Sequence, residues 1–205
     1  MKSTLKRSQK VYLFFKRAID IFGATLGIIL LSPLLLVAAF LTKVTSKGPV
    51  LFKQERAGKN LKTFRIYKFR SMYADAPNIA PENMSQDKQQ SLVTKWGRFM
   101  RKTSIDEFPQ LFNILKGDMS FIGPRPSLPM GLETELIQAR FSYVPNAYEV
   151  KPGLSGYAQI HTKRSHDIYA KAKYDSYYVS HLGFWFDVKI FVYSFLVLFG
   201  FAKGR

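Results

Sequence analysis

Two neighbouring carboxylates, Asp106 and Glu107, are the residues of this chain best suited to chemistry. They follow Arg101-Lys102 in a chain with 31 Lys and Arg against 14 Asp and Glu, a formal net charge of +17. A carboxylate held ionised near a helix N-terminus can attack a phosphoryl group or bind Mg²⁺. Adjacent helical residues diverge by about 100°, so the pair indicates two tasks rather than one shared proton.

The same pair also fits a structural role. Ser104 and Glu107 have the spacing of a capping box, in which Ser104 is the N-cap and Glu107 reaches back to it. Asp106 would then only favour the positive end of the helix. Pro109 lies one turn after Ile105 and removes a backbone hydrogen bond, so we expect an irregular helix start. The pair by itself leaves both interpretations open.

Arg125 lies between two prolines, Pro124 and Pro126. The prolines restrict the backbone, so the forked guanidinium can meet a phosphate with little entropy left to lose. Phosphoryl transfer mainly needs positioning and neutralisation of negative charge, which arginine, lysine and Mg²⁺ supply. The alternative for Arg125 is a surface turn with an incidental charge.

Composition restricts the class of protein. At 205 residues with 47% hydrophobic content, the chain can form one domain with a core. The absence of cysteine excludes disulfides and thiolate metal sites, and three histidines without helical pair spacing argue against a histidine metal centre. The first 74 residues carry fifteen Lys and Arg against two acids, which favours a polyanionic partner, either nucleic acid or an anionic membrane surface.

An uncharged run of 22 residues separates Asp20 from Lys43. As a helix it would measure about 33 Å, enough to cross a bilayer core of about 30 Å. Pro33 should bend that helix, and the hydroxyl of Ser32 can bond a carbonyl freed by the proline. Both flanks are basic, and basic flanks prefer the cytoplasm. The residues alone leave a straight span and a re-entrant hairpin equally open.

Hydrophobic periodicity and turn residues predict the elements that must position these groups. Phe108, Leu111, Phe112 and Leu115 share one helical stripe, which Lys116-Gly117 should end. The other predicted elements are a β-hairpin within 50–72, a polar surface loop or short helix over 74–95, helices over 131–143 and 166–179, a short extended piece within 150–160, and a core or interfacial helix within 190–202.

Three segments together resemble the small monotopic phosphoglycosyl transferases of the bacterial sugar transferase family. They are "YKFRSM" (67–72), "RKTSIDEFPQLFNILKGDMSFIGPRP" (101–126) and "KPGLSGYAQI" (151–160), preceded by the membrane segment with Ser32-Pro33. The resemblance implies an α-dominated α+β fold with a short β-hairpin and interfacial amphipathic helices. Residues 1–48 would form a basic segment and a re-entrant helix-break-helix membrane hairpin. Residues 49–205 would form a compact cytosolic, membrane-associated catalytic domain.

The resemblance also implies a reaction. Such enzymes transfer a sugar 1-phosphate from a UDP-sugar to undecaprenyl phosphate through an aspartyl-phosphosugar intermediate and release UMP. Asp106 matches the nucleophile and a ligand of Mg²⁺, and Glu107 matches its partner. The remaining matches are basic or polar positions expected to bind substrate phosphates: Lys68, Arg101, Arg125 and Gln159. The implied location is the cytoplasmic face of the bacterial inner membrane, and a homodimer is left open.

One stretch departs from the family pattern. "HTKRSH" (161–166) stands where many relatives have a Gly-Arg-Asn-like turn, so no sugar preference can be inferred. A membrane-tethered nucleic-acid binder or a non-catalytic scaffold is the alternative that the +17 charge allows. We expect no nucleic-acid partner, because no segment resembles a nucleic-acid-binding motif.

Overall fold

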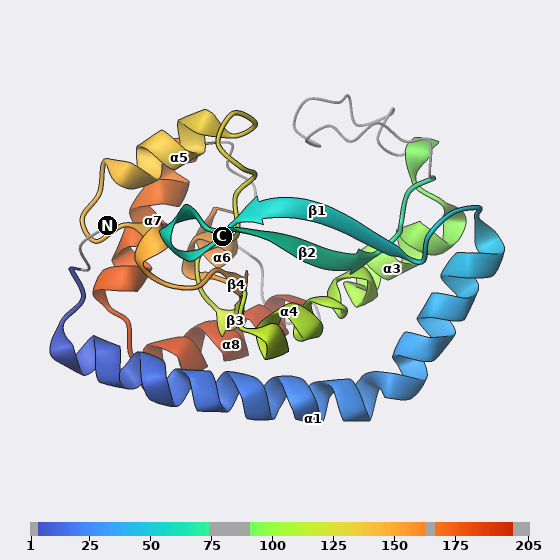
Figure 1. Cartoon of the computed structure of the whole chain (residues 1–205), viewed down its shortest axis with the longest axis horizontal. Coiled ribbons are helices and arrows are strands. Elements are labelled where there is room, and N and C mark those ends of the chain that lie inside the picture. Colours follow the sequence, from blue (N-terminus) through green and yellow to red (C-terminus); the bar gives the residue numbers. More distant parts are fainter. Residues whose placement is uncertain (1–3, 74–90, 163–166, 199–205) are drawn as a thin grey trace.

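The computed structural model describes residues 4–73, 91–162 and 167–198, and within them helices dominate (Figure 1). The predicted α-dominated α+β class is confirmed. The described helices are α1 (Arg7–Thr45), α3 (Lys95–Thr103), α4 (Gln110–Lys116), α5 (Thr134–Phe141), α6 (Tyr157–His161), α7 (Ile168–Ser180) and α8 (Phe184–Leu198). The described strands are β1 (Leu51–Ala57), β2 (Thr63–Phe69), β3 (Ser120–Ile122) and β4 (Gly153–Ser155).

Helix α1 runs for 39 residues with Pro33 inside it. Figure 1 shows its last part turning away from the direction of its first part. Pro33 has no N–H for the carbonyl of Ile29, and the Ser32 hydroxyl donates to that same carbonyl at 2.8 Å. The predicted role of Ser32 is therefore confirmed. By length and composition, α1 could cross a membrane, but core helices of soluble proteins and signal sequences pass the same test. Its re-entrant path through the membrane stays a prediction.

Both ends of α1 are attached to the body of the protein. Just before its first turn, the backbone N–H of Thr4 donates to the carboxylate of Glu149 at 2.6 Å. At its other end, the guanidinium of Arg70 donates to the carbonyls of Ser46, at 2.6 Å, and of Thr42, at 3.2 Å. Arg70 thus satisfies carbonyls that a helix C-terminus leaves without partners. Both ends of α1 are therefore bonded to the body of the protein that follows it in the chain.

The middle of α1 packs on α4. Ala24 is fully buried among Leu111, Ile114 and Met119, which form one cluster of the core. Asp20 is also buried, and its carboxylate accepts hydrogen bonds from the Ser120 hydroxyl at 3.0 Å and the Phe121 N–H at 3.2 Å. One oxygen of its carboxylate therefore has two hydrogen-bond donors inside the protein.

The β-hairpin predicted within 50–72 is confirmed. β1 and β2 pair antiparallel from Leu51 opposite Phe69 to Ala57 opposite Thr63, with a 3₁₀ turn, Lys59–Leu61, between them. β4 confirms the short extended piece predicted within 150–160, whereas β3 and its parallel pairing with β4 were not predicted. Their three-residue strands are too short to show a period, and they lie about thirty residues apart in the chain.

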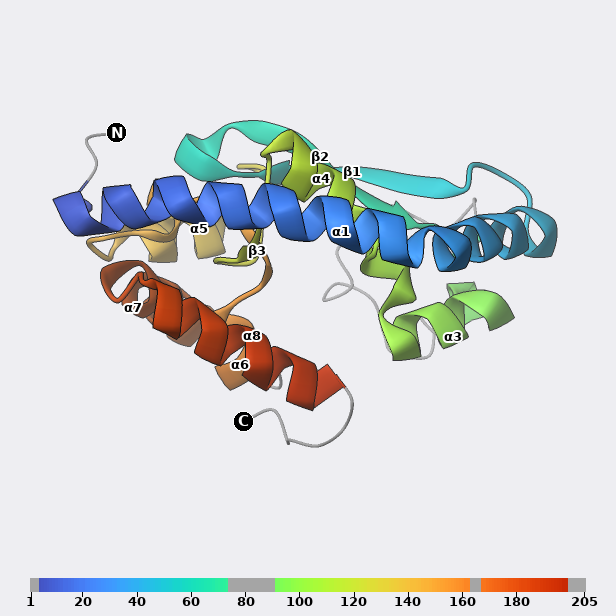
Figure 2. The same cartoon turned by 90° about the horizontal axis from the view of Figure 1, so that it is seen from below.

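The remaining helices follow the predictions with shifted ends. α5 and α7 fall within or beside their predicted ranges, whereas α3 and α6 were not predicted. α8 starts at Phe184, before the apolar run, because its charged residue Asp187 pairs with Lys16 of α1. Seen from below, α1 and α8 lie on the same side of the molecule (Figure 2). The loop predicted over 74–95 lies outside the described residues from 74 to 90.

Candidate active site

The two carboxylates lie on a 3₁₀ turn, Ile105–Glu107, between α3 and α4. Ser104 ends α3 in the left-handed conformation, with φ 57°, and its side chain makes no capping hydrogen bond. The predicted capping box is therefore wrong, because the backbone at Ser104 is not that of an N-cap. The irregular start expected from Pro109 is confirmed, since α4 begins only at Gln110, and the expected stop at Gly117 is also observed.

Glu107 is turned toward β2. Its carboxylate accepts a hydrogen bond from the Lys68 ammonium at 2.6 Å and another from the side chain of Gln110. Burial acts to raise the pKa of Glu107, but the charges of Lys68 and Arg125 and these hydrogen bonds together lower it below its usual value. Glu107 is thus an ionised, ion-paired residue.

Asp106 is buried, with 8% of its surface exposed. Burial and the neighbouring charge of Glu107 raise its pKa to about 6, while Lys68 and Arg101 act in the opposite direction. Within residues 4–73, 91–162 and 167–198, no cation lies within 4.0 Å of its carboxylate. Asp106 is consequently ionised at neutral pH and free to meet a ligand.

Arg101 reaches this turn from α3. Its Nε donates to the Ser71 hydroxyl at 2.9 Å, which ties the end of α3 to the segment that follows β2. The approach is close because Gly97 faces the Ser71 carbonyl, where a Cβ would lie 1.9 Å from the oxygen. The lack of a side chain at Gly97 thus brings Arg101 to the strand that carries Lys68.

Arg125 combines a fixed backbone with an exposed guanidinium. Its flanking prolines are buried, and its carbonyl accepts a hydrogen bond from Arg140 at 2.9 Å. Arg140 is itself held by a buried ion pair with Asp175, at 2.6 Å. The structure therefore agrees with the prediction that a restricted loop presents the guanidinium of Arg125. The positive charge of Arg125 also acts to lower the pKa of Glu107.

Gln159 is not brought to the carboxylates by any interaction among the described residues. It lies on α6, and its buried Oε1 has no hydrogen-bond donor in the described part of the chain. The atom lies 3.1 Å from where a Cβ of Gly156 would be, against the loop that leads to Arg125. Of residues 161–166, which depart from the family pattern, the structure describes His161 and Thr162 but not 163–166.

Sequence reasoning missed Asn113, which fixes α4 to the hairpin. Its side chain is fully buried, donates to the Arg65 carbonyl at 2.7 Å and accepts from the Tyr67 N–H at 3.0 Å. It therefore satisfies two backbone groups of β2 that flank Ile66, just before Lys68. An amide within a mostly apolar helical segment was the available signal. Arg140 and Ser71 carried no such signal.

Asp106 has the chemistry of a Mg²⁺ ligand. Among the described residues there is no cluster of three or more His, Cys, Asp or Glu side chains that could hold a metal alone. Mg²⁺ usually binds one or two carboxylates together with waters and substrate phosphates, so a complete protein cage is not required. A buried carboxylate without a cation partner fits such a role.

A buried free carboxylate, a paired one and converging cations define a site for phosphate chemistry. The family model described as bacterial sugar transferase matches residues 11–200, so the chain belongs to that family, as the resemblance predicted. It is 41% identical over 183 residues to the UDP-N-acetylgalactosamine-undecaprenyl-phosphate N-acetylgalactosaminephosphotransferase of Aeromonas hydrophila, covering 88% of this chain and 42% of that protein.

Two further relatives show the range of lengths. The UDP-glucose:undecaprenyl-phosphate glucose-1-phosphate transferase of Escherichia coli (strain K12) is 38% identical, over 85% of this chain and 38% of its own length. The exopolysaccharide production protein PSS of Rhizobium leguminosarum bv. phaseoli is 37% identical, over 87% of this chain and 92% of its own length. The chain thus spans about two fifths of the first two relatives and nearly all of the third.

Proposed function

We propose that this protein transfers a sugar 1-phosphate from a UDP-sugar to undecaprenyl phosphate, as an early membrane step of glycan synthesis. The observation that carries the proposal is the buried carboxylate of Asp106, which has no ion-pair partner in the described part of the chain, beside the Glu107–Lys68 ion pair. The names of relatives that match 85–88% of this chain support both the donor and the acceptor.

The proposed chemistry has two steps. An oxygen of Asp106 attacks the β-phosphorus of the donor, the bond from that phosphorus to the bridging oxygen breaks, and UMP leaves with the bridging oxygen. A phosphate oxygen of the lipid then attacks the same phosphorus, and the carboxylate of Asp106 is released as the lipid diphosphosugar forms. An ionised carboxylate without an ion-pair partner suits this nucleophilic role.

The surrounding residues would stabilise the charge that spreads over the phosphates. Lys68 and Arg101 act near Asp106, and Arg125 offers an exposed fork that can bind a diphosphate in two places. Glu107 would hold Lys68 in place through their ion pair, and its negative charge would raise the pKa of Asp106. Mg²⁺ bound by Asp106 and the donor phosphates would supply further charge neutralisation.

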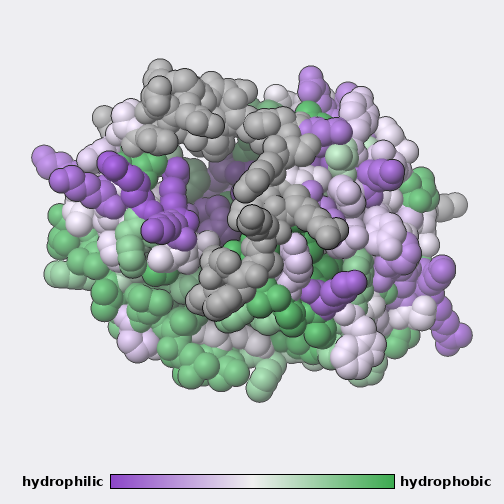
Figure 3. Space-filling view, turned by 180° about the vertical axis from the view of Figure 1, so that it is seen from behind, coloured by the Kyte–Doolittle hydropathy of each residue, from purple (hydrophilic) through white to green (hydrophobic). Residues whose placement is uncertain are grey.

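The apolar surface supports a membrane location. Side chains on α1 and α8 are widely exposed, with Phe14 at 76%, Phe22 and Leu36 at 71% and Trp185 at 79%. Apolar residues also gather along the lower side of the molecule in Figure 3. Contiguous exposed apolar patches mark membrane or partner surfaces, so we infer that this one inserts into one leaflet of the bilayer. Basic flanks on both sides of α1 favour the cytoplasmic face of the inner membrane.

UMP release tests the reaction directly. The full chain in detergent would be incubated with Mg²⁺, a panel of UDP-sugars and undecaprenyl phosphate. We expect release with at least one donor, and a loss of at least about 10³-fold in Asp106→Asn, which keeps shape but removes the nucleophile. Asp167→Asn, a matched change at the start of α7, should keep the rate. Full turnover in Asp106→Asn would overturn the nucleophile assignment, and removal of Mg²⁺ by EDTA should also abolish release.

A further inference from the structure

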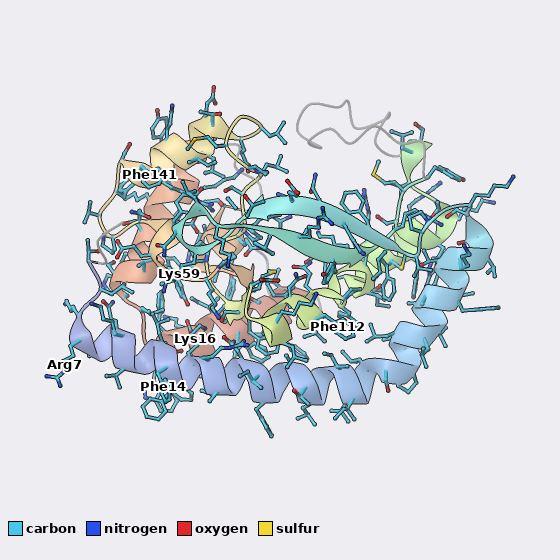
Figure 4. The ribbon with its side chains drawn as sticks, in the orientation of Figure 1. Arg7, Phe14, Lys16, Lys59, Phe112 and Phe141 are labelled. Carbon is cyan, nitrogen blue, oxygen red and sulfur yellow. The ribbon has the colours of Figure 1, made fainter. Side chains whose placement is uncertain are left out.

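A cavity lies between the first half of α1 and the body of the protein. Its volume is about 220 Å³, and its walls come from α1, the hairpin turn, β3 and the segment before β4. In Figure 4, Lys16 points from α1 toward the body, Phe14 points away from it, and Lys59 marks the hairpin turn. The lining residues include none of Asp106, Glu107, Lys68, Arg101 and Arg125.

The cavity is remote from the carboxylate turn. Lys59 belongs to the hairpin turn, whereas Lys68 lies five residues beyond Thr63, the first residue of β2. At about 3.3 Å per residue, that stretch of strand alone is about 16 Å long. Lys59 of the cavity and Lys68 of the carboxylate site therefore lie toward opposite ends of the hairpin.

Three cations meet at the cavity: Arg17, Lys59 and Lys151. A terminal nitrogen of Arg17 and the ammonium of Lys151 each lie 3.2 Å from where a Cβ of Gly117 would be, so the two groups are at most twice that distance apart. Arg17 is held there by the carbonyls of Ile114, at 2.6 Å, and Leu115, at 2.8 Å. These two hydrogen bonds hold the guanidinium of Arg17 beside the ammonium of Lys151.

The protein offsets only part of the positive charge at this place. Burial, followed by the charges of Arg17 and Lys59, lowers the pKa of Lys151, although Asp20 and Asp118 act to raise it. In the described part of the chain, neither Lys59 nor Lys151 has a carboxylate within 4.0 Å.

The acids near the cavity are already engaged. Asp20 accepts hydrogen bonds from Ser120 and Phe121, and Asp187 pairs with the fourth cation of the cavity wall, Lys16. A bound anion would therefore supply the partner that Lys59 and Lys151 lack.

The shape of the cavity restricts the anion. Its volume lies below the roughly 300–1,000 Å³ of pockets for drug-sized ligands, so a whole nucleotide sugar would not fit. Leu13 and Leu182 give it an apolar wall, and Phe14 at its edge points out into the exposed apolar surface of α1. Cations beside an apolar wall at a membrane surface match a phosphate group with a hydrocarbon chain below it.

We propose that this cavity binds the phosphate of a phosphate-bearing anion through Lys59, Lys151 and Arg17, separately from the site at Asp106. An anionic phospholipid headgroup and free phosphate share this chemistry and are its two sources. In its lipid form, the proposal rests on the membrane association proposed above. Occupancy by a phospholipid would fasten the first half of α1 to the hairpin turn and to β3.

Native mass spectrometry of the full chain in detergent tests the proposal. The protein would be titrated with phosphatidylglycerol and, in parallel, with phosphatidylcholine; inorganic phosphate binding would be followed by ³¹P NMR. We expect one bound phosphatidylglycerol and weaker phosphatidylcholine binding. Lys59→Gln/Lys151→Gln should bind the anionic lipid about 25-fold more weakly, since each lysine near a membrane anion contributes about fivefold.

Controls separate a defined site from general attraction. Lys95→Gln/Lys173→Gln removes the same charge from exposed positions outside the cavity and should keep the affinity. Asp106→Asn should also keep it, whether or not the protein proves to be a transferase. Phosphate binding that needs Lys59 and Lys151, without retention of phosphatidylglycerol, would assign the cavity to the soluble source. Equal losses in the two double variants, or no loss in Lys59→Gln/Lys151→Gln with thermal unfolding unchanged, would overturn the proposal.

Discussion

The ammonium of Lys68 lies 2.6 Å from a carboxylate oxygen of Glu107, whereas Asp106, the next residue back, has no such partner among the described residues. The two carboxylates thus differ in environment as well as in direction. Burial and the charge of Glu107 raise the pKa of Asp106, and the cations around Glu107 lower its own. This division of roles agrees with one carboxylate that reacts and one that organises cations.

Glu107→Gln tests that division. We expect the variant to form the phosphosugar adduct on Asp106 but more slowly, by about 10²–10³-fold, because a displaced Lys68 no longer stabilises the phosphates. Intact-mass measurement with UDP-sugar and no lipid acceptor would follow the adduct. Asp106→Asn should give no adduct at any time. An adduct of equal yield in Asp106→Asn would mean that another residue is modified.

Arg125→Ala should weaken the use of the donor without unfolding the protein. Charged hydrogen bonds to phosphate contribute about 1.5–3 kcal/mol, so kcat/KM for the UDP-sugar should fall roughly 10- to 150-fold. Arg125→Lys should recover only part of it, because an ammonium cannot make the paired contact. Arg98→Ala on α3, also exposed, is the matched control. A rate unaffected by Arg125→Ala would remove Arg125 from the site.

The topology of α1 can be tested because the chain has no cysteine. Arg7→Cys and Lys47→Cys introduce exposed thiols just inside the start of α1 and just beyond its end. If both ends stay on the cytoplasmic side, a membrane-impermeant maleimide should label neither in spheroplasts and both in inverted vesicles. Labelling of one position in each preparation would show a straight span instead.

Arg140→Met should destabilise the fold strongly. It leaves Asp175 as a buried charge without its partner, which typically costs about 3–5 kcal/mol, and it frees the Arg125 carbonyl. The double variant Arg140→Met/Asp175→Leu should recover much of the loss, measured by urea unfolding in detergent. Arg65→Met is the matched control, because Arg65 and Glu55 form an exposed pair at 3.9 Å that should contribute less than about 1 kcal/mol. Similar losses in both single variants would contradict this account.

Gly97→Ala should disturb the active site from a distance. Its Cβ would lie 1.9 Å from the Ser71 carbonyl, so α3 must move and carry Arg101 away from Lys68. We expect a lower melting temperature, in line with the roughly 1–3 kcal/mol typical of overpacking, together with a reduced rate. In Gly183→Ala, the nearest atom would be 3.8 Å from the new Cβ, so this control should behave like the wild type.

Local signals determined much of this structure. Pro33 and Ser32 predicted the bent helix, turn residues predicted the hairpin, and Lys116-Gly117 predicted the end of α4, because each feature depends on backbone chemistry within a few residues. Residue type and spacing indicated Asp106, Glu107 and Arg125, motif resemblance added Lys68, Arg101 and Gln159, and the family is confirmed by comparison. The capping box failed because the spacing of Ser104 and Glu107 says nothing about the left-handed backbone at Ser104.

Only the tertiary structure decided how these residues meet. Lys68 and Glu107 are 39 positions apart, and Arg140 holds both the Arg125 carbonyl and a carboxylate 35 positions further along. The parallel pairing of β3 with β4 and the cluster of Arg17, Lys59 and Lys151 likewise join distant segments. Such contacts depend on how helices and strands pack around a common core, and no short stretch of sequence contains that information.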